Sequence, residues 1–126
     1  MHVEVVTNVI PTLNDDAQLA AIAEWIKAHL GAETPWHVTG FHPDAMLQGV
    51  PPTSTATLLH ARHTGLAAGL HFVYTGNVVG TGGENTSCHR CGNLAIERIG
   101  YRTRMIGVAA GGRCARCGES LNIRGV

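Results

Sequence analysis

The four cysteines of the chain come in two closely spaced pairs. Residues 88–92 and 114–118 are two C-x-x-C-G units separated by 22 residues. Each C-x-x-C turn can present two sulfurs to one ion, and the following glycine allows the positive-φ backbone that brings amide groups toward sulfur. The spacing therefore predicts one four-thiolate metal site, whose ligands are Cys88, Cys91, Cys114 and Cys117.

Zinc is the metal expected in this site, because a closed tetrahedral set of four sulfurs is most often structural. Iron in a rubredoxin-like site remains the alternative, since the sequence does not separate the two. Residues 94–101 and 102–108 are expected to form a β-hairpin with few apolar side chains, so metal binding would supply stability that its core lacks. A redox role for the cysteines is disfavoured, because a thioredoxin-type site needs only one pair. His89 could replace one thiolate, but the four cysteines already complete a tetrahedral set.

Charge is distributed unevenly along the chain. Residues 1–87 hold two Lys and Arg against seven Asp and Glu, whereas residues 88–126 hold seven Arg against two Glu. A glycine-rich stretch separates the two regions, so we expect three parts: residues 1–76, a linker at 77–87 and a zinc ribbon at 88–126. The clustered arginines indicate either nucleic-acid contact or, as we favour, a solvated surface or docking onto the acidic region.

Alternating strand and helix patterns fill the first region. Residues 3–10 predict a strand buried on both faces, followed by a helix capped by Asn14 and ended by Gly31. A second strand is expected at 36–41, then a helix capped by Ser54 and ended by Gly69, and a third strand at 71–75. The inward positions expected in this second helix are Leu59, Leu66 and Ala67. The fold class predicted is α/β, with parallel strands in the order βαβαβ.

The composition of the chain indicates its broad class of protein. The chain has 126 residues, is 44% hydrophobic and 14% charged, and has no formal net charge. These values are typical of a globular protein, and no apolar run approaches the ~20 residues of a membrane-spanning helix. The start of the chain lacks a secretory signal pattern, so we expect a cytoplasmic protein with reduced thiols.

Six segments resemble the AmmeMemoRadiSam-system radical SAM enzymes, which are relatives of the pyruvate formate-lyase activating enzymes. The segments are TNVIPTLND at 7–15, TPWHV at 34–38, FHPD at 41–44, PPT at 51–53, VYTGNVVG at 73–80 and GENTSC at 83–88. The resemblance covers essentially the whole chain but only the C-terminal part of such an enzyme. It implies the last strands and helices of a partial (β/α) barrel, followed by the ribbon.

The chain differs from this family in the cysteines that bind the catalytic iron–sulfur cluster. Radical SAM enzymes hold a [4Fe–4S] cluster on a C-x-x-x-C-x-x-C triplet, and one iron binds S-adenosylmethionine (SAM). No such triplet occurs here, and all four cysteines belong to the C-x-x-C-G units. The resemblance thus implies an enzyme segment that uses SAM and the cluster only when a missing N-terminal half completes it.

Three polar residues are candidate cofactor contacts by this resemblance. His42 would lie near the methionine part of SAM, and Asn8 and Asn77 would lie on the same rim at the carboxyl ends of their strands. Turn-forming asparagines and a loop histidine are equally plausible roles. His60 and His63, three residues apart, are interpreted as solvated helix residues, and Trp25 and Trp36 as core or edge-covering aromatics.

Two functional hypotheses follow. The first is the C-terminal segment of a radical SAM activating-enzyme-like protein, inactive alone. The second is a stand-alone zinc-ribbon interaction or assembly module, with nucleic-acid binding through its arginines as a further possibility. Because a three-stranded sheet has two open edges, both hypotheses predict a homo-oligomer or a cluster-bearing partner chain, and neither involves a membrane.

Overall fold

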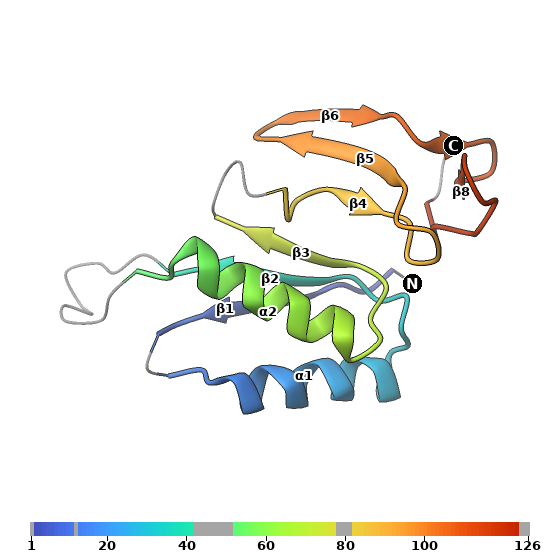
Figure 1. Ribbon diagram of the computed structural model, residues 1–126. Helices are drawn as coiled ribbons and strands as arrows, with labels where there is room; N and C mark the ends of the chain where they lie inside the picture. Colours follow the sequence, from blue (N-terminus) through green and yellow to red (C-terminus); the bar gives the residue numbers. More distant parts are fainter. Residues whose placement is uncertain (1, 12, 42–51, 78–81, 124–126) are drawn as a thin grey trace.

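The computed structural model describes residues 2–11, 13–41, 52–77 and 82–123 (Figure 1). Its first region follows the order β1 (Val5–Val9), α1 (Asp16–His29), β2 (Trp36–Gly40), α2 (Thr55–Ala67) and β3 (Val73–Gly76). The three strands form a parallel sheet in the order β1-β2-β3. The predicted α/β class and the parallel βαβαβ order are therefore confirmed.

Helix α1 begins one residue later than the sequence suggested. Asp15 is the N-cap, and it forms a capping box with Gln18, whose backbone N–H donates to the Asp15 carboxylate at 2.8 Å. Asn14 instead accepts a hydrogen bond from the backbone N–H of Ile10 at 2.7 Å, which closes the turn after β1. Gly31 follows the helix with φ +103°, as expected of a residue that ends it.

Helix α2 is capped by Ser54 as predicted, but its inward face is different. The buried positions are Leu58, Ala61 and Gly65, whereas the expected Leu59 and Leu66 are 39% and 37% exposed and Ala67 is also exposed. The two sets differ by a rotation about the helix axis. Beside Leu58, the small residues Ala61 and Gly65 let the helix backbone lie close to the sheet.

Trp36 is the centre of the core under the helices. The side chain is fully buried, and its indole N–H donates to the Thr7 hydroxyl at 2.9 Å. A Cβ added at Gly65 would lie 2.8 Å from the Trp36 ring and 2.9 Å from Val73, so only glycine allows α2 to approach this closely. Trp36 is thus a core aromatic, as predicted, while Trp25 on α1 is 53% exposed.

Both helices lie on one face of the sheet (Figure 1). The opposite face, here called the helix-free face, contains half-exposed and exposed side chains. Its residues are Val6, Asn8, His37, Thr39, Tyr74 and Gly76. The expectation that the first strand is buried on both faces is wrong, because right-handed crossovers between successive neighbouring strands place every helix on the same side.

The second region contains short antiparallel strands. They are β4 (Thr86–Ser87), β5 (Leu94–Ile99), β6 (Arg102–Met105), β7 (Val108–Ala109) and β8 (Arg113–Cys114). The sheet order β4-β5-β6 includes the predicted hairpin, and β4 lies within the stretch predicted as a linker. We call residues 86–123 the cysteine module. Neither helix in the described part of the chain has the length and hydropathy of a membrane-spanning segment.

The cysteine module lies along the β3 edge of the parallel sheet (Figure 1). The backbone N–H of Thr75 donates to the Gly83 carbonyl at 3.0 Å, which extends the sheet beyond β3. The hydroxyls of Tyr74 and Thr86 are 2.8 Å apart, and the Arg98 guanidinium lies over the Tyr74 ring at 5.5 Å. One of the two sheet edges is therefore covered by the chain itself.

Replacing Gly65 by alanine tests the close contact between α2 and the sheet. Alanine in place of glycine normally stabilises a helix by about 0.5–1 kcal/mol. Here the added methyl group meets Trp36 and Val73, so we expect Gly65→Ala to lower the free energy of unfolding by about 1–3 kcal/mol. Urea unfolding followed by far-ultraviolet circular dichroism measures the change. His63→Ala, at an exposed position of the same helix, is the control, and a stabilising effect of Gly65→Ala would contradict the packing.

Candidate metal centre

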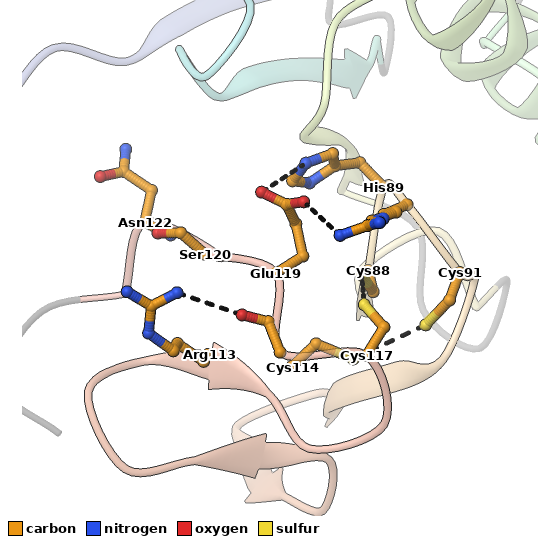
Figure 2. A network of polar contacts seen from close by, with 11 residues as sticks. Cys88, His89, Cys91, Arg113, Cys114, Cys117, Glu119, Ser120 and Asn122 are labelled. Atoms are coloured by element: carbon orange, nitrogen blue, oxygen red, sulfur yellow. Dashed lines mark hydrogen bonds and ion pairs between the residues drawn. The ribbon is translucent and has the colours of Figure 1, made fainter.

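The four cysteine sulfurs gather around one point. All four Sγ atoms lie within 4.8 Å of one another, and the Cys88–Cys117 and Cys91–Cys114 sulfurs are each 3.6 Å apart (Figure 2). A tetrahedral ion with metal–sulfur bonds of about 2.3 Å separates its ligands by about 3.8 Å. The arrangement can therefore hold a single metal ion, as the spacing of the cysteines predicted.

Both C-x-x-C-G turns have the same backbone hydrogen bonds. The N–H of Gly92 donates to the Cys88 carbonyl at 2.8 Å, and the N–H of Gly118 donates to the Cys114 carbonyl at 2.9 Å. The two glycines have φ +77° and +79°, a conformation that side chains disfavour. The glycine after each pair is thus required by the turn that places the two sulfurs together.

Backbone amides influence the protonation of the thiols. The N–H of Cys117 lowers the pKa of Cys114 to about 6, and the N–H of Arg116, 3.4 Å from the Cys114 sulfur, acts in the same direction. The N–H of Glu119 also lowers the pKa of Cys117, but burial and the other three cysteines outweigh it and raise that pKa to about 12. Four thiolates so close together repel one another, and a bound cation removes this repulsion.

A second layer of contacts joins this centre to the parallel sheet. The Glu119 carboxylate lies 3.9 Å from the Nε2 atom of His89 (Figure 2). Its other oxygen is 3.4 Å from the Arg90 guanidinium. The His89 ring stacks on His71 with centroids 3.8 Å apart and an interplanar angle of 3°. Burial, and then the proximity of His89, lowers the pKa of His71, which favours the neutral ring. His89 therefore serves as a contact between module and sheet.

The apolar core of the cysteine module is small. Besides the buried Cys88 and Cys114 it consists of Ala95, Ile96 and Leu121. This core is separate from the one formed by α1, α2 and the parallel sheet. The hairpin of β5 and β6 thus depends on the cysteines for much of its buried contact.

Two of the three candidate cofactor residues lie at the carboxyl edge of the parallel sheet. Asn8 is exposed near the end of β1, with its Oδ1 3.5 Å from the Thr39 hydroxyl. Asn77 follows β3 with φ +62°, and its amide donates to the Gly40 carbonyl at 3.2 Å. Asn8 and Asn77 therefore lie at the same carboxyl edge of the sheet, where each makes a hydrogen bond to β2. His42 lies outside the described residues.

The remaining histidines and arginines lie at the surface or join elements. His60 Nε2 is 3.2 Å from the Asp16 carboxylate, an acid that the sequence reasoning did not place nearby, and both side chains are more than half exposed. Arg104 pairs with Glu97 at 3.6 Å within the cysteine module. Among the arginines of the cysteine module, Arg98 contacts β3 through the Tyr74 ring, and Arg62 of α2 donates to the Val73 carbonyl of the same strand at 2.9 Å.

Sequence reasoning missed a cavity of about 520 Å³ between the helix-free face and the β5–β6 hairpin. Its walls include Glu4, His37 and Tyr74 from the sheet region and Arg98 and Tyr101 from the hairpin. The sequence did contain a pattern that could have indicated this cavity. Apolar and polar residues alternate from Trp36 to Thr39, and such alternation indicates a strand with one face not covered by the core.

Removal of the metal is expected to unfold the cysteine module and leave the helices intact. Structural zinc sites contribute about 10–16 kcal/mol of apparent binding free energy, whereas the apolar core around these cysteines is small. Cys114→Ala, or a chelator, should abolish hydrogen-exchange protection in β5 and β6 while α1 stays protected. Hydrogen exchange followed by mass spectrometry measures the protection of both segments. Arg116→Ala, at an exposed position between Cys114 and Cys117, is the control. A hairpin that stays protected without metal would show that its folding does not depend on the metal.

Comparison with known proteins gives one relative. An uncharacterized protein of Methanocaldococcus jannaschii is 43% identical over 123 residues, which are 96% of this chain. The chain spans only 37% of the length of that relative. No family model matches the chain, and no solved structure matches it.

Proposed function

We propose that this chain is the C-terminal segment of a radical SAM activating-enzyme-like protein, with a structural zinc ribbon. The resemblance of its six segments to the AmmeMemoRadiSam-system enzymes is the starting point. In this proposal the cluster and the bound SAM belong to a separate N-terminal half, and the present chain completes the barrel. By itself the chain forms no radical, because it has no C-x-x-x-C-x-x-C triplet.

The observation that carries this proposal is the one-sided covering of the parallel sheet. In a (β/α) barrel, helices cover the outer face of the sheet and the inner face receives ligands. The helix-free face, with the exposed Val6 and Asn8 and the half-exposed His37 and Tyr74, is consistent with such an inner face. Among the described residues β1 pairs only with β2, so its other edge is available to a preceding strand of the barrel.

The length of the relative is also consistent with a missing half. The Methanocaldococcus jannaschii protein extends well beyond the matched region, because this chain covers 37% of it. The uncovered part is long enough for further strands and a cluster motif. In the proposal, Asn8, Asn77 and His42 lie on the rim that faces SAM, once that half is in place.

Zinc is the metal we propose for the four cysteines. Sulfur separations of 3.6 Å suit one tetrahedral ion, and a cubane iron–sulfur cluster would hold the thiolates further apart. The closed set leaves no open coordination position for a substrate. Its role is therefore structural, holding the cysteine module against the β3 edge.

Complementation tests the proposed function. The chain is co-expressed with the part of the Methanocaldococcus jannaschii relative that it does not cover, purified anaerobically and supplied with SAM and a reductant. We expect the two polypeptides to copurify and to release 5′-deoxyadenosine, and the chain alone to release none.

A partner with its cluster cysteines replaced by alanine is the matched control, expected to bind but not to cleave SAM. Absence of a complex together with absence of cleavage would count against the proposal. An uncovered part without a C-x-x-x-C-x-x-C motif would do the same.

A second candidate function is assembly through the cysteine module. All four residues of β6 are exposed, and β6 is the outer strand of its sheet among the described residues. Met105 at the end of β6 and the nearby Ile99 and Ile106 are each at least half exposed. An edge strand with unpaired backbone N–H and C=O groups favours pairing with a strand of another chain. We propose that a second copy of this chain pairs here through the apolar side chains at the two ends of β6, which itself also contains Arg102 and Arg104.

Native mass spectrometry tests this candidate. Met105→Lys places a charge on the edge and should convert a dimer into a monomer, while Ala110→Lys, an exposed position outside β6, should not. A monomeric parent protein would contradict assembly of this kind. Retention of the parent on a polyanion column that falls steeply with salt would indicate nucleic-acid binding through the arginines instead.

A further inference from the structure

A second group of metal-ligating side chains lies at the start of β1, away from the cysteines. His2 Nε2 is 3.2 Å from one oxygen of the Glu4 carboxylate, and His37 Nε2 is 3.4 Å from the other. Glu4 precedes β1, and His37 is the second residue of β2, which pairs with β1 in parallel. The carboxylate thus has an imidazole nitrogen at each of its oxygens.

The contact between His37 and Glu4 differs from an ordinary hydrogen bond. The Nε2 atom of His37 is buried and has no hydrogen-bond partner, although the Glu4 oxygen is 3.4 Å away. Ligands of one tetrahedral ion with bonds of about 2.0–2.1 Å lie about 3.3–3.4 Å apart and point at the ion instead of at each other. The separation and the poor hydrogen-bond geometry of this nitrogen both fit two ligands of a common metal.

Charge and orientation at this position also suit a cation. The hydrogen bond with His2 lowers the pKa of Glu4 and outweighs the opposing effect of burial, so the carboxylate is ionised at neutral pH. The His37 ring stacks on Tyr74, with centroids 5.3 Å apart, and the Tyr74 hydroxyl contacts Thr86. Before any ion binds, the Glu4 carboxylate is therefore already charged and the His37 ring is already oriented.

Two of the three side chains, Glu4 and His37, open onto the cavity of about 520 Å³ beside the helix-free face. Glu4 and His37 lie in one wall, and the opposite wall contains Arg98 and Tyr101 of the hairpin. Arg98 is engaged with the Glu84 carbonyl at 3.0 Å and the Thr86 hydroxyl at 2.8 Å. A cation held by Glu4 and His37 would face a space large enough for water or a small substrate.

We propose that His2, Glu4 and His37 form a second metal site, which takes a divalent transition-metal ion and leaves a coordination position open to the cavity. Two imidazoles and one carboxylate are the donor set of catalytic zinc and non-haem iron sites. Among the described residues only the cysteines already have their ligand atoms gathered around one point. The His2 side chain is 63% exposed and already contacts Glu4, so in this proposal it turns toward the ion to complete the set.

Cobalt binding distinguishes this site from the cysteine site. The untagged chain is first given one equivalent of Zn²⁺, which the thiolates hold more tightly than cobalt, and is then titrated with Co²⁺ alone. We expect one further Co²⁺ per chain by equilibrium dialysis. Its spectrum should show visible ligand-field bands without the ultraviolet charge-transfer band of thiolate–cobalt bonds.

Three variants identify the ligands. Glu4→Gln, His2→Ala and His37→Phe, which keeps an aromatic ring against Tyr74, should each weaken Co²⁺ binding about tenfold or more. His63→Ala, an exposed histidine on α2, should leave the affinity unchanged. Bound zinc and thermal unfolding verify that each variant is folded, and His2, exposed near the chain start, is a position where substitution cannot disturb a core.

The proposal is overturned if the zinc-loaded chain binds no second ion. It is also overturned if all three variants bind Co²⁺ as tightly as the parent. Either result would identify the His2–Glu4–His37 group as an ion-pair cluster that orders the start of β1. The outcome is independent of the complementation experiment, because it needs neither SAM nor a partner chain.

Discussion

The right-handed crossover between neighbouring parallel strands is the constraint on which this structure depends. With strand order β1-β2-β3, it places α1 and α2 on one face of the sheet. The buried apolar side chains of the first core, among them Ile26, Val38 and Leu58, then pack with Trp36 on that face, and Gly65 lets α2 approach the ring. The other face has no helix, and it is there that the polar side chains and the cavity lie.

The cysteine module is joined to this sheet by contacts that involve few residues. Tyr74 of β3 contacts both Thr86 and Arg98, and His71 stacks on His89, which lies between two cysteines. Because His89 is held by the first C-x-x-C turn, its stack with His71 depends on the geometry of the four cysteines. The cavity has one wall from each region, so its shape depends on both the sheet and the module.

The two ligand groups differ in chemistry as well as in position. Four thiolates form a soft, closed set suited to structural zinc, whereas two imidazoles and a carboxylate form a mixed set that leaves positions for other ligands. If the chain completes a radical SAM barrel, the helix-free face becomes its interior, and Glu4 and His37 then lie inside. If it assembles alone, the same face stays open to solvent and to small molecules.

Local patterns in the sequence determined the elements and the four-cysteine site. Ser54, Gly31 and the two C-x-x-C-G units act through hydrogen bonds and backbone conformations within a few residues, so their roles could be predicted. Which side of α2 is buried, which face of the sheet has no helix, and the meeting of Glu4 with His37 were decided only by the tertiary structure. These features depend on contacts between residues distant in the chain, because crossover handedness and close packing at Gly65 set them, and no short stretch of sequence contains that information.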